Sequence, residues 1–230
     1  MGATMADDGL EPLLAALDID PGRTPPAADE HPIVSISCPL AADVHDPDWL
    51  TERPAAHLGL TTLGNRTWTH RDGERTLDAS IREVTADRSP AGVVVVGHTD
   101  CDVVADAYDR CCGPAHPAAA GVRASLAPLE RVVADAVEDG IVDSETPRRR
   151  NHHRLVEYNV VRNVAFLRDR FPSLTVAGVV VDQAGVYGSF PGTGYLVALD
   201  AVTEPAALRA RLPADTRLSV ESLLPAASIK

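Results

Sequence analysis

Runs of consecutive apolar residues dominate the hydrophobic pattern of the chain, and each run is bounded by polar or turn-forming residues. Continuous runs of this length are typical of strands that are buried on both faces of a sheet. The clearest are GVVVVGH at 92–98, LTVAGVVVD at 174–182 and GYLVALD at 194–200, and the folded body begins with PIVSISC at 32–38, a β-branched run that ends in Cys38. A further β-like run, LGLTTLGNRTW, covers 58–68.

Segments with helical spacing separate these runs. The stretch TLDASIREVTADR at 76–88 places Leu77, Ile81 and Val84 on one helical face. Further helical patterns cover 101–109, 122–139, 152–170 and a short stretch after residue 203. Strands that alternate with helices predict the α/β class, with a mostly parallel β-sheet flanked by helices on both faces.

The first thirty residues have a different character from the rest. DGLEPLLAAL at 8–17 predicts a short amphipathic helix, and a Pro-rich, polar linker, DIDPGRTPPAADEHP, follows it. We therefore expect two parts: an N-terminal helical arm over residues 1–30 and one α/β domain over residues 31–230.

Length and composition predict a soluble protein with one main domain. The chain has 230 residues, of which 45% are hydrophobic, enough for a sizeable core. No apolar run approaches the roughly 18 residues that a membrane span requires. The N-terminus lacks the basic and apolar regions of a secretion signal. We expect a cytoplasmic protein.

The charge balance narrows the range of partners. The formal net charge is −12, and Lys230 is the only lysine among the 21 basic residues. An acidic excess disfavours nucleic acid and anionic membranes, because phosphate binding depends on basic patches. A surface rich in Asp and Glu and almost without Lys suggests a halophile, whose salt screens the repulsion. The alternative is an ordinary acidic protein from a GC-rich genome.

The cysteines and one histidine suggest a metal site. Cys38 follows one predicted strand, while His98 and Cys101 come at the end of another. If these strands are neighbours in a parallel sheet, the three side chains converge at its carboxyl edge. Two cysteines and a histidine, with a fourth position open for water, form a ligand set typical of catalytic zinc. The alternative is that the cysteines are core residues and no metal binds.

The other two cysteines, Cys111 and Cys112, are adjacent and precede Gly-Pro, which is typical of a helix end. The one basic cluster is RRRNHHR at 148–154. We expect it to form salt bridges in an acidic dimer, and the alternative is that it binds bicarbonate or a phosphate.

The sequence GHTDC after a valine-rich strand, together with the earlier strand-end Cys38, resembles the β-class carbonic anhydrases. Other segments follow in the family's order. LGNRTW resembles the segment with the family's Asn-Ala-Gly-Asn motif, LDASIREV the helix before the second metal strand, and NVVRNVAFLRD with LTVAGVVVD the later helix and strand. The resemblance covers roughly residues 31–200.

This resemblance implies a β-carbonic-anhydrase-like fold and a homodimer or higher homo-oligomer, with the N-terminal helix packed on the partner. It implies Zn²⁺ held by Cys38, His98 and Cys101. The implied activity is the reversible hydration of carbon dioxide to bicarbonate. Hydrolysis of a related small molecule, such as carbonyl sulfide or carbon disulfide, is a close variant.

One family motif is incomplete. The family's Cys-x-Asp-x-Arg motif supplies a carboxylate that receives the hydrogen bond of the zinc-bound hydroxide and an arginine that holds this carboxylate. Here Leu40 stands at the Asp position and Ala42 at the Arg position. Zinc binding does not need this dyad, so the alternative function is that of a catalytically inactive zinc-binding relative.

Two carboxylates are candidate catalytic residues in place of the missing dyad. Asp43 lies five residues after Cys38, and either turns back to the metal or is a solvated loop residue. Asp100 lies inside the His-x-x-Cys turn. It either serves the metal's water or caps the free N–H groups of the next helix.

Overall fold

The structure is a computed structural model. It describes residues 32–39, 57–113, 119–188, 190–212 and 219–225. The predicted N-terminal arm lies outside the described residues, and so does the candidate catalytic residue Asp43.

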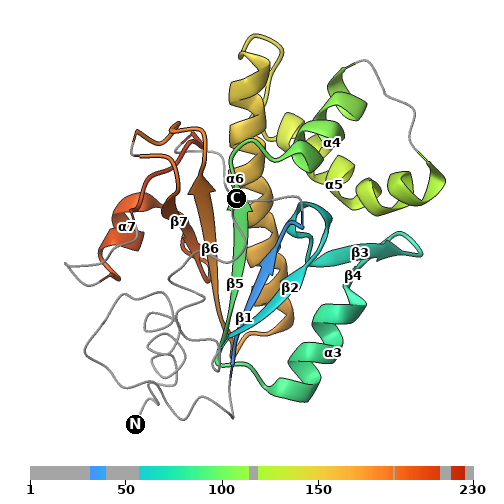
Figure 1. Cartoon of the computed structure of the whole chain (residues 1–230), viewed down its shortest axis with the longest axis vertical. Coiled ribbons are helices and arrows are strands. Elements are labelled where there is room, and N and C mark those ends of the chain that lie inside the picture. The colour runs from blue at the N-terminus through green and yellow to red at the C-terminus, as the bar shows by residue number, and fades with distance from the viewer. Residues whose placement is uncertain (1–31, 40–56, 114–118, 189, 213–218, 226–230) are drawn as a thin grey trace.

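A five-stranded sheet in the order β2-β1-β5-β6-β7 forms the centre of the fold (Figure 1). The first four strands in this order pair in parallel, and β7 runs antiparallel to β6. The strands are β1 Ile33–Ser37, β2 His57–Thr61, β5 Gly92–His98, β6 Thr175–Asp182 and β7 Thr193–Leu199. The predicted mostly parallel sheet is confirmed.

The continuous apolar runs arise because both faces of the central strands are covered. Every residue of β1, β5 and β6 is buried. Within β5, Val93 and Val95 belong to the core on one face, while Val94 and Val96 belong to the core on the other. Alternate side chains of a strand point to opposite faces, so a sheet with two cores favours apolar residues on both faces. Buried polar residues such as Ser35 and Asp182 are exceptions within these strands.

Helices flank the sheet on both faces, as predicted (Figure 1). The long helix α6 packs closely on one face, where a Cβ atom added at Gly97 or Gly178 would lie 2.6 or 2.7 Å from Val160. The short helix α7 contributes Leu208 to the core on the other face. The helices are α3 Ala79–Arg88, α4 Asp102–Cys112, α5 Ala120–Glu138, α6 Arg148–Arg170 and α7 Pro205–Arg209. Among the described helices, none is both long and apolar enough to cross a bilayer.

The prediction of one β-like run over 58–68 is wrong. Strand β2 ends at Thr61, a short 3-10 helix η2 covers Leu63–Asn65, and the chain re-enters a strand at Trp68. The chain turns because Gly64 (φ 65°) and Asn65 (φ 48°) adopt left-handed conformations. The new strand, β3 Trp68–Arg71, pairs with β4 Glu74–Leu77 in a separate antiparallel hairpin.

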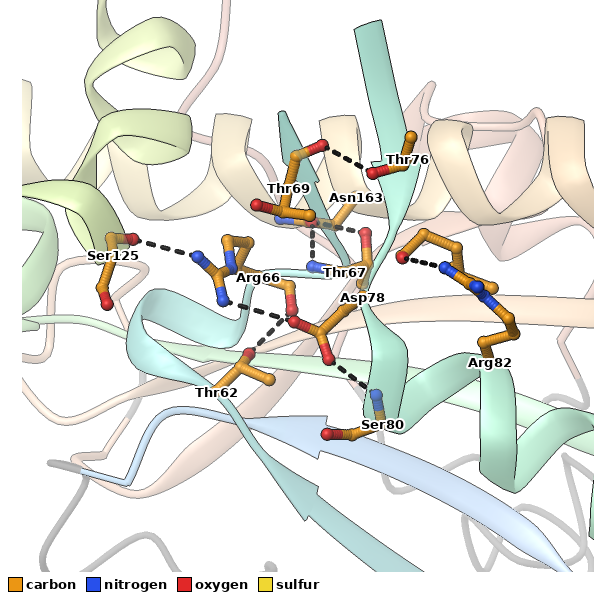
Figure 2. A network of polar contacts seen from close by, with 11 residues as sticks. Thr62, Arg66, Thr67, Thr69, Thr76, Asp78, Ser80, Arg82, Ser125 and Asn163 are labelled. Carbon is orange, nitrogen blue, oxygen red and sulfur yellow. Dashed lines mark hydrogen bonds and ion pairs between the residues drawn. The ribbon is translucent and has the colours of Figure 1, made fainter. Parts of the chain in front are cut away.

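Polar contacts hold the chain after η2 against two helices (Figure 2). The backbone N–H and the hydroxyl of Thr67 both donate to Asn163 Oδ1 on α6, at 2.9 and 2.6 Å. The guanidinium of Arg66 donates to the carbonyl of Ser125 on α5 at 3.1 Å and to Asp78 Oδ2 at 3.3 Å. These contacts fix η2 beside the carboxyl end of β1, where the candidate site lies.

Candidate metal centre

The sheet register brings Cys38 and His98 to the same edge. Strands β1 and β5 are parallel neighbours, with Ile36 opposite Val95. Cys38 comes directly after β1, His98 is the last residue of β5, and Cys101 is the N-cap residue of α4. The possible ligand atoms of Cys38, His98 and Cys101 all lie within 4.8 Å of one another. The convergence expected from the strand ends is therefore present.

The spacing of the two sulfurs fits a metal ion between them. Cys38 Sγ and Cys101 Sγ are 4.0 Å apart, far beyond the roughly 2.05 Å of a disulfide bond. Two thiolates on a tetrahedral zinc ion, each at about 2.3 Å, are about 3.8 Å apart. The exposed fractions of Cys38, His98 and Cys101 are only 2, 7 and 4%, so protein rather than solvent surrounds the site.

One ring nitrogen of His98 is available to bind a metal ion. Its Nδ1 lies 3.2 Å from the carbonyl oxygen of Thr99. Its Nε2 is buried and has no hydrogen-bond partner among the described residues. A buried polar atom without a partner is costly. An Nδ1–H bond to a carbonyl leaves the Nε2 lone pair available, which is the usual arrangement of a metal-binding histidine.

The two buried thiols need a cation to ionise together. The hydrogen bond to Cys38, burial and the charge of the second sulfur all raise the pKa of the Cys101 thiol. On the other side, the backbone N–H of Gly64 donates to Cys38 Sγ at 3.4 Å, which favours a thiolate. A metal ion that prefers thiolate and imidazole resolves the conflict, and zinc is the usual choice for this donor set. The residues present therefore fit zinc.

Gly64 is a site residue that the sequence analysis missed. A Cβ atom at this position would lie 2.9 Å from Leu129 Cδ2, and the φ of 65° already disfavours other residues. The side chain of Asn159 on α6 donates to the Gly64 carbonyl at 2.9 Å. These contacts aim the Gly64 N–H at the sulfur. The available signal was the Leu-Gly-Asn sequence within the segment that resembles a family motif.

Contacts with β6 hold the loop between His98 and Cys101 in place. The backbone N–H of Thr99 donates to the carbonyl of Val181 at 3.0 Å. The Thr99 hydroxyl donates to the buried Asp182 at 3.2 Å and accepts from the N–H of Ala184 at 2.9 Å. The loop therefore keeps its shape through the neighbouring strand.

Asp100 points its carboxylate at α6. It adopts a left-handed conformation (φ 60°), and its oxygens lie 3.1 Å from Arg149 Nη2 and 3.3 Å from His153 Nε2. The N-cap of α4 is Cys101, which has no side-chain capping bond. Within the described part of the chain, the cluster of possible metal ligands does not include Asp100. Asp43, with Leu40 and Ala42, lies outside the described residues.

No protein-family model and no curated protein matches the sequence. Solved structures do match the fold. The β-carbonic anhydrase CafA of the fungus Aspergillus fumigatus is 20% identical with a TM-score of 0.53, over 84% of this chain and 85% of that one. A Coccomyxa β-carbonic anhydrase in complex with acetazolamide is 19% identical with a TM-score of 0.55, over 83% and 82%.

A tetrameric β-carbonic anhydrase from Sordaria macrospora is also similar, at 18% identity and a TM-score of 0.52, over 74% of this chain and 82% of that one. Each match extends over most of both chains, so the likeness concerns the whole fold and not one motif. The chain therefore has the fold of the β-class carbonic anhydrases, and the resemblance predicted from its motifs is confirmed at that level.

Proposed function

We propose that the protein is a zinc-dependent carbonic anhydrase, which catalyses the reversible hydration of carbon dioxide to bicarbonate. The observation that carries this proposal is the cluster of Cys38, His98 and Cys101 at the carboxyl edge of a β-carbonic-anhydrase-like sheet. Low sequence identity to the solved enzymes supports only the fold, so the argument for activity comes from the site.

The residues of the site have distinct tasks. Cys38, His98 and Cys101 would hold the metal, and a site with three protein ligands keeps a position for water. Zinc bound there would supply Lewis acidity for the attack of water. The Gly64 N–H stabilises the thiolate of Cys38, and the bond between Thr99 and Val181 keeps the ligand loop on β6.

Asp100 is our first candidate for the missing carboxylate–arginine dyad. It lies between two metal ligands in the sequence, and Arg149 holds its carboxylate from α6. We assign to this pair the task that Asp and Arg of the Cys-x-Asp-x-Arg motif have in the family, which is to orient the reacting water. Asp43, five residues after Cys38, is the second candidate.

We propose that the protein works as a homodimer or higher homo-oligomer in the cytoplasm, with carbon dioxide and bicarbonate as its small-molecule ligands. The tetrameric Sordaria macrospora enzymes support self-association. The net charge of −12 supports a salt-rich environment and argues against nucleic acid as a partner.

The alternative is a zinc-binding relative without catalytic activity. Leu40 and Ala42 at the positions of the family's Asp and Arg favour it. In such a protein the metal stabilises the fold, and its fourth position is closed by a further ligand.

Stopped-flow measurement of carbon dioxide hydration in high salt, on protein of known zinc content, tests the proposal. We expect a rate above that of buffer, which disappears in Cys101→Ala. Asp100→Asn should lower kcat by about 10- to 100-fold at unchanged zinc content, as expected for a group that orients a metal-bound reactant. Asp102→Asn is the matched control, because Asp102 is exposed in the first turn of α4, and it should leave the rate unchanged.

Full zinc occupancy without any rate above buffer would contradict the proposal and favour the inactive relative. A wild-type rate in both Asp100→Asn and Asp102→Asn would retain the enzyme and transfer the role of the carboxylate to Asp43.

A further inference from the structure

A cavity of about 510 Å³ lies beside the first turns of α6. Its wall comes from three segments: the start of α6, the loop after β6 and the C-terminal segment 219–225. The start of α6 and the loop after β6 both lie at the carboxyl end of the parallel strands (Figure 1). The volume is within the range typical of small-molecule sites, about 300–1,000 Å³.

Positive charge is concentrated on the α6 side of this cavity. Arg148, Arg149 and Arg150 follow one another in the first turn, which has no acidic residue. Cations at the positive end of a helix dipole are unfavourable unless an anion compensates them. Arg148 pairs with Asp109, and Arg149 with Asp100.

Arg150 lines the cavity and has no ion pair with any residue that the structure describes. Its guanidinium is thus the uncompensated cation of this turn, and it lies where a ligand in the cavity can reach it.

His153 provides an independent indication of a ligand. It lines the cavity, yet its side chain is only 3% exposed. Its Nε2 lies 3.3 Å from Asp100 Oδ1, and neither Nε2 nor Nδ1 has a hydrogen-bond partner among the described residues. A buried ring nitrogen without a partner is costly, and a ligand in the cavity can supply the missing bond. The carboxylate of Asp100 already lies beside Arg149 and His153, at 3.1 and 3.3 Å.

The opposite wall is apolar and held in place. Val186 and Leu223 line it. The buried carboxylate of Glu157 on α6 accepts hydrogen bonds from the hydroxyl of Tyr187 at 2.8 Å and from the backbone N–H of Leu223 at 2.7 Å, and a third from the hydroxyl of Ser222. Both apolar residues are therefore attached to the helix that carries the arginines, and the cavity is preformed.

We propose that this cavity binds a small organic molecule in which a carboxylate or phosphate group is attached to an apolar body. The oxyanion contacts Arg149, Arg150 and His153, and the apolar body packs on Val186 and Leu223. Bicarbonate alone fills only a small part of the volume. The metal ligands are not among the residues that line this cavity. Arg149 is, and the proposed function also assigns it to the pair with Asp100, so the tests below change Arg150 and Val186, which have no role in the proposed function.

Titration calorimetry on the zinc-loaded full chain tests this site with phenyl phosphate, benzoate, inorganic phosphate and bicarbonate. We expect saturable binding of phenyl phosphate or benzoate at one site, and the tighter of the two identifies the preferred oxyanion. Inorganic phosphate and bicarbonate should bind more weakly, because they lack an apolar body to bury.

A pair of matched variants tests where the oxyanion binds. Arg150→Gln should weaken the tighter probe by about tenfold, as expected when one charge-assisted hydrogen bond is lost. Arg148→Gln removes the same charge from the same helical turn, but Arg148 pairs with Asp109 instead of lining the cavity. It should change the affinity by less than about twofold.

A third variant locates the apolar body. Val186 is 38% exposed, so Val186→Ser should leave the fold intact. It should weaken phenyl phosphate or benzoate but not inorganic phosphate. The proposal is overturned by the absence of saturable binding for every probe. Equal losses in Arg148→Gln and Arg150→Gln also overturn it, because they would show diffuse charge attraction.

Discussion

Helix α4 carries cysteine at both of its ends, and the two ends differ in almost every physical respect. At its N-terminus, Cys101 is 4% exposed and lies 4.0 Å from the sulfur of Cys38. At its C-terminus, Cys111 and Cys112 are exposed. Adjacent positions in the sequence do not bring ligands together, whereas Cys38 and Cys101, which lie on separate elements, meet at the edge of the sheet.

The hydrogen bonds of the sulfur atoms also differ between the buried and the exposed cysteines. Cys38 Sγ accepts from the backbone N–H of Gly64, an arrangement that favours a thiolate. The thiol of Cys111 instead donates to the carbonyl of Glu130 at 3.5 Å, which requires its proton. Within the described part of the chain, the cluster of possible metal ligands includes Cys38 and Cys101 but neither Cys111 nor Cys112. The surroundings of a sulfur therefore decide whether it is a ligand.

The largest effect should come from removing a sulfur of the buried pair. Cys101→Ala is expected to abolish stoichiometric zinc binding and to lower the Tm by about 10 °C, because metal binding contributes directly to folding stability. Cys112→Ala, at the other end of α4, should keep full zinc content and a Tm within about 2 °C of wild type. Zinc analysis by mass spectrometry and thermal unfolding measure both effects. Equal losses of zinc and of Tm in the two variants would contradict the difference between the buried and the exposed cysteines.

Bound zinc should produce a difference in reactivity between the two cysteine pairs, and its removal should expose the buried pair to a thiol reagent. In zinc-loaded protein, a thiol reagent should modify Cys111 and Cys112 and leave Cys38 and Cys101 unmodified until a chelator is added. Mass spectrometry of the labelled peptides distinguishes them. Labelling of Cys101 before Cys111 without a chelator would show that no metal protects the buried pair.

The pH dependence of the exposed pair follows from its surroundings. Cys111 is exposed as a residue, but its thiol is partly shielded from water. This partial burial, then the charges of Glu130 and Cys112, raise the pKa of Cys111 to about 11. The thiolate is the reactive form, so a raised pKa means that the thiol dominates at neutral pH. Labelling of Cys111 should therefore accelerate about tenfold per pH unit between about pH 8 and pH 10. A rate that levels off near pH 8 would contradict the raised pKa.

Part of the candidate site can be predicted from the sequence and part cannot. Continuous apolar runs predict buried strands, and neighbouring parallel strands end at one edge. The pattern therefore predicts that Cys38 meets His98 if β1 and β5 are neighbours, and the structure confirms that they are. The partners of Asp100 do not follow, because Arg149 and His153 come from a distant helix. Nothing local in the sequence indicates which way that carboxylate turns.

The role of Gly64 depends on tertiary structure in a similar way. The run 58–68 has the composition of a strand, and propensity alone favours an extended chain there. The close approach of Leu129 and the bond from Asn159 select a left-handed turn instead. Such contacts join segments far apart in the sequence, so a single sequence does not contain them in readable form.

Gly64→Ala tests how much the hydrogen bond from the Gly64 N–H to Cys38 contributes to zinc affinity at the buried cysteines. The added Cβ meets Leu129 Cδ2 at 2.9 Å, and the position requires a positive φ. Either the buried Leu129 side chain or the turn must shift, and we expect the bond to Cys38 to lengthen. We expect about a tenfold loss of zinc affinity, as for other groups that bond to metal ligands, and a free energy of unfolding lower by about 1–3 kcal/mol. Competition with a chromophoric chelator measures the affinity.

Gly73→Ala is the matched control, since Gly73 has a φ of +84° but no atom within 4 Å of the added Cβ. It should show the backbone strain alone, with unchanged zinc affinity, so that equal zinc losses in both variants would remove the N–H of Gly64 from the metal centre.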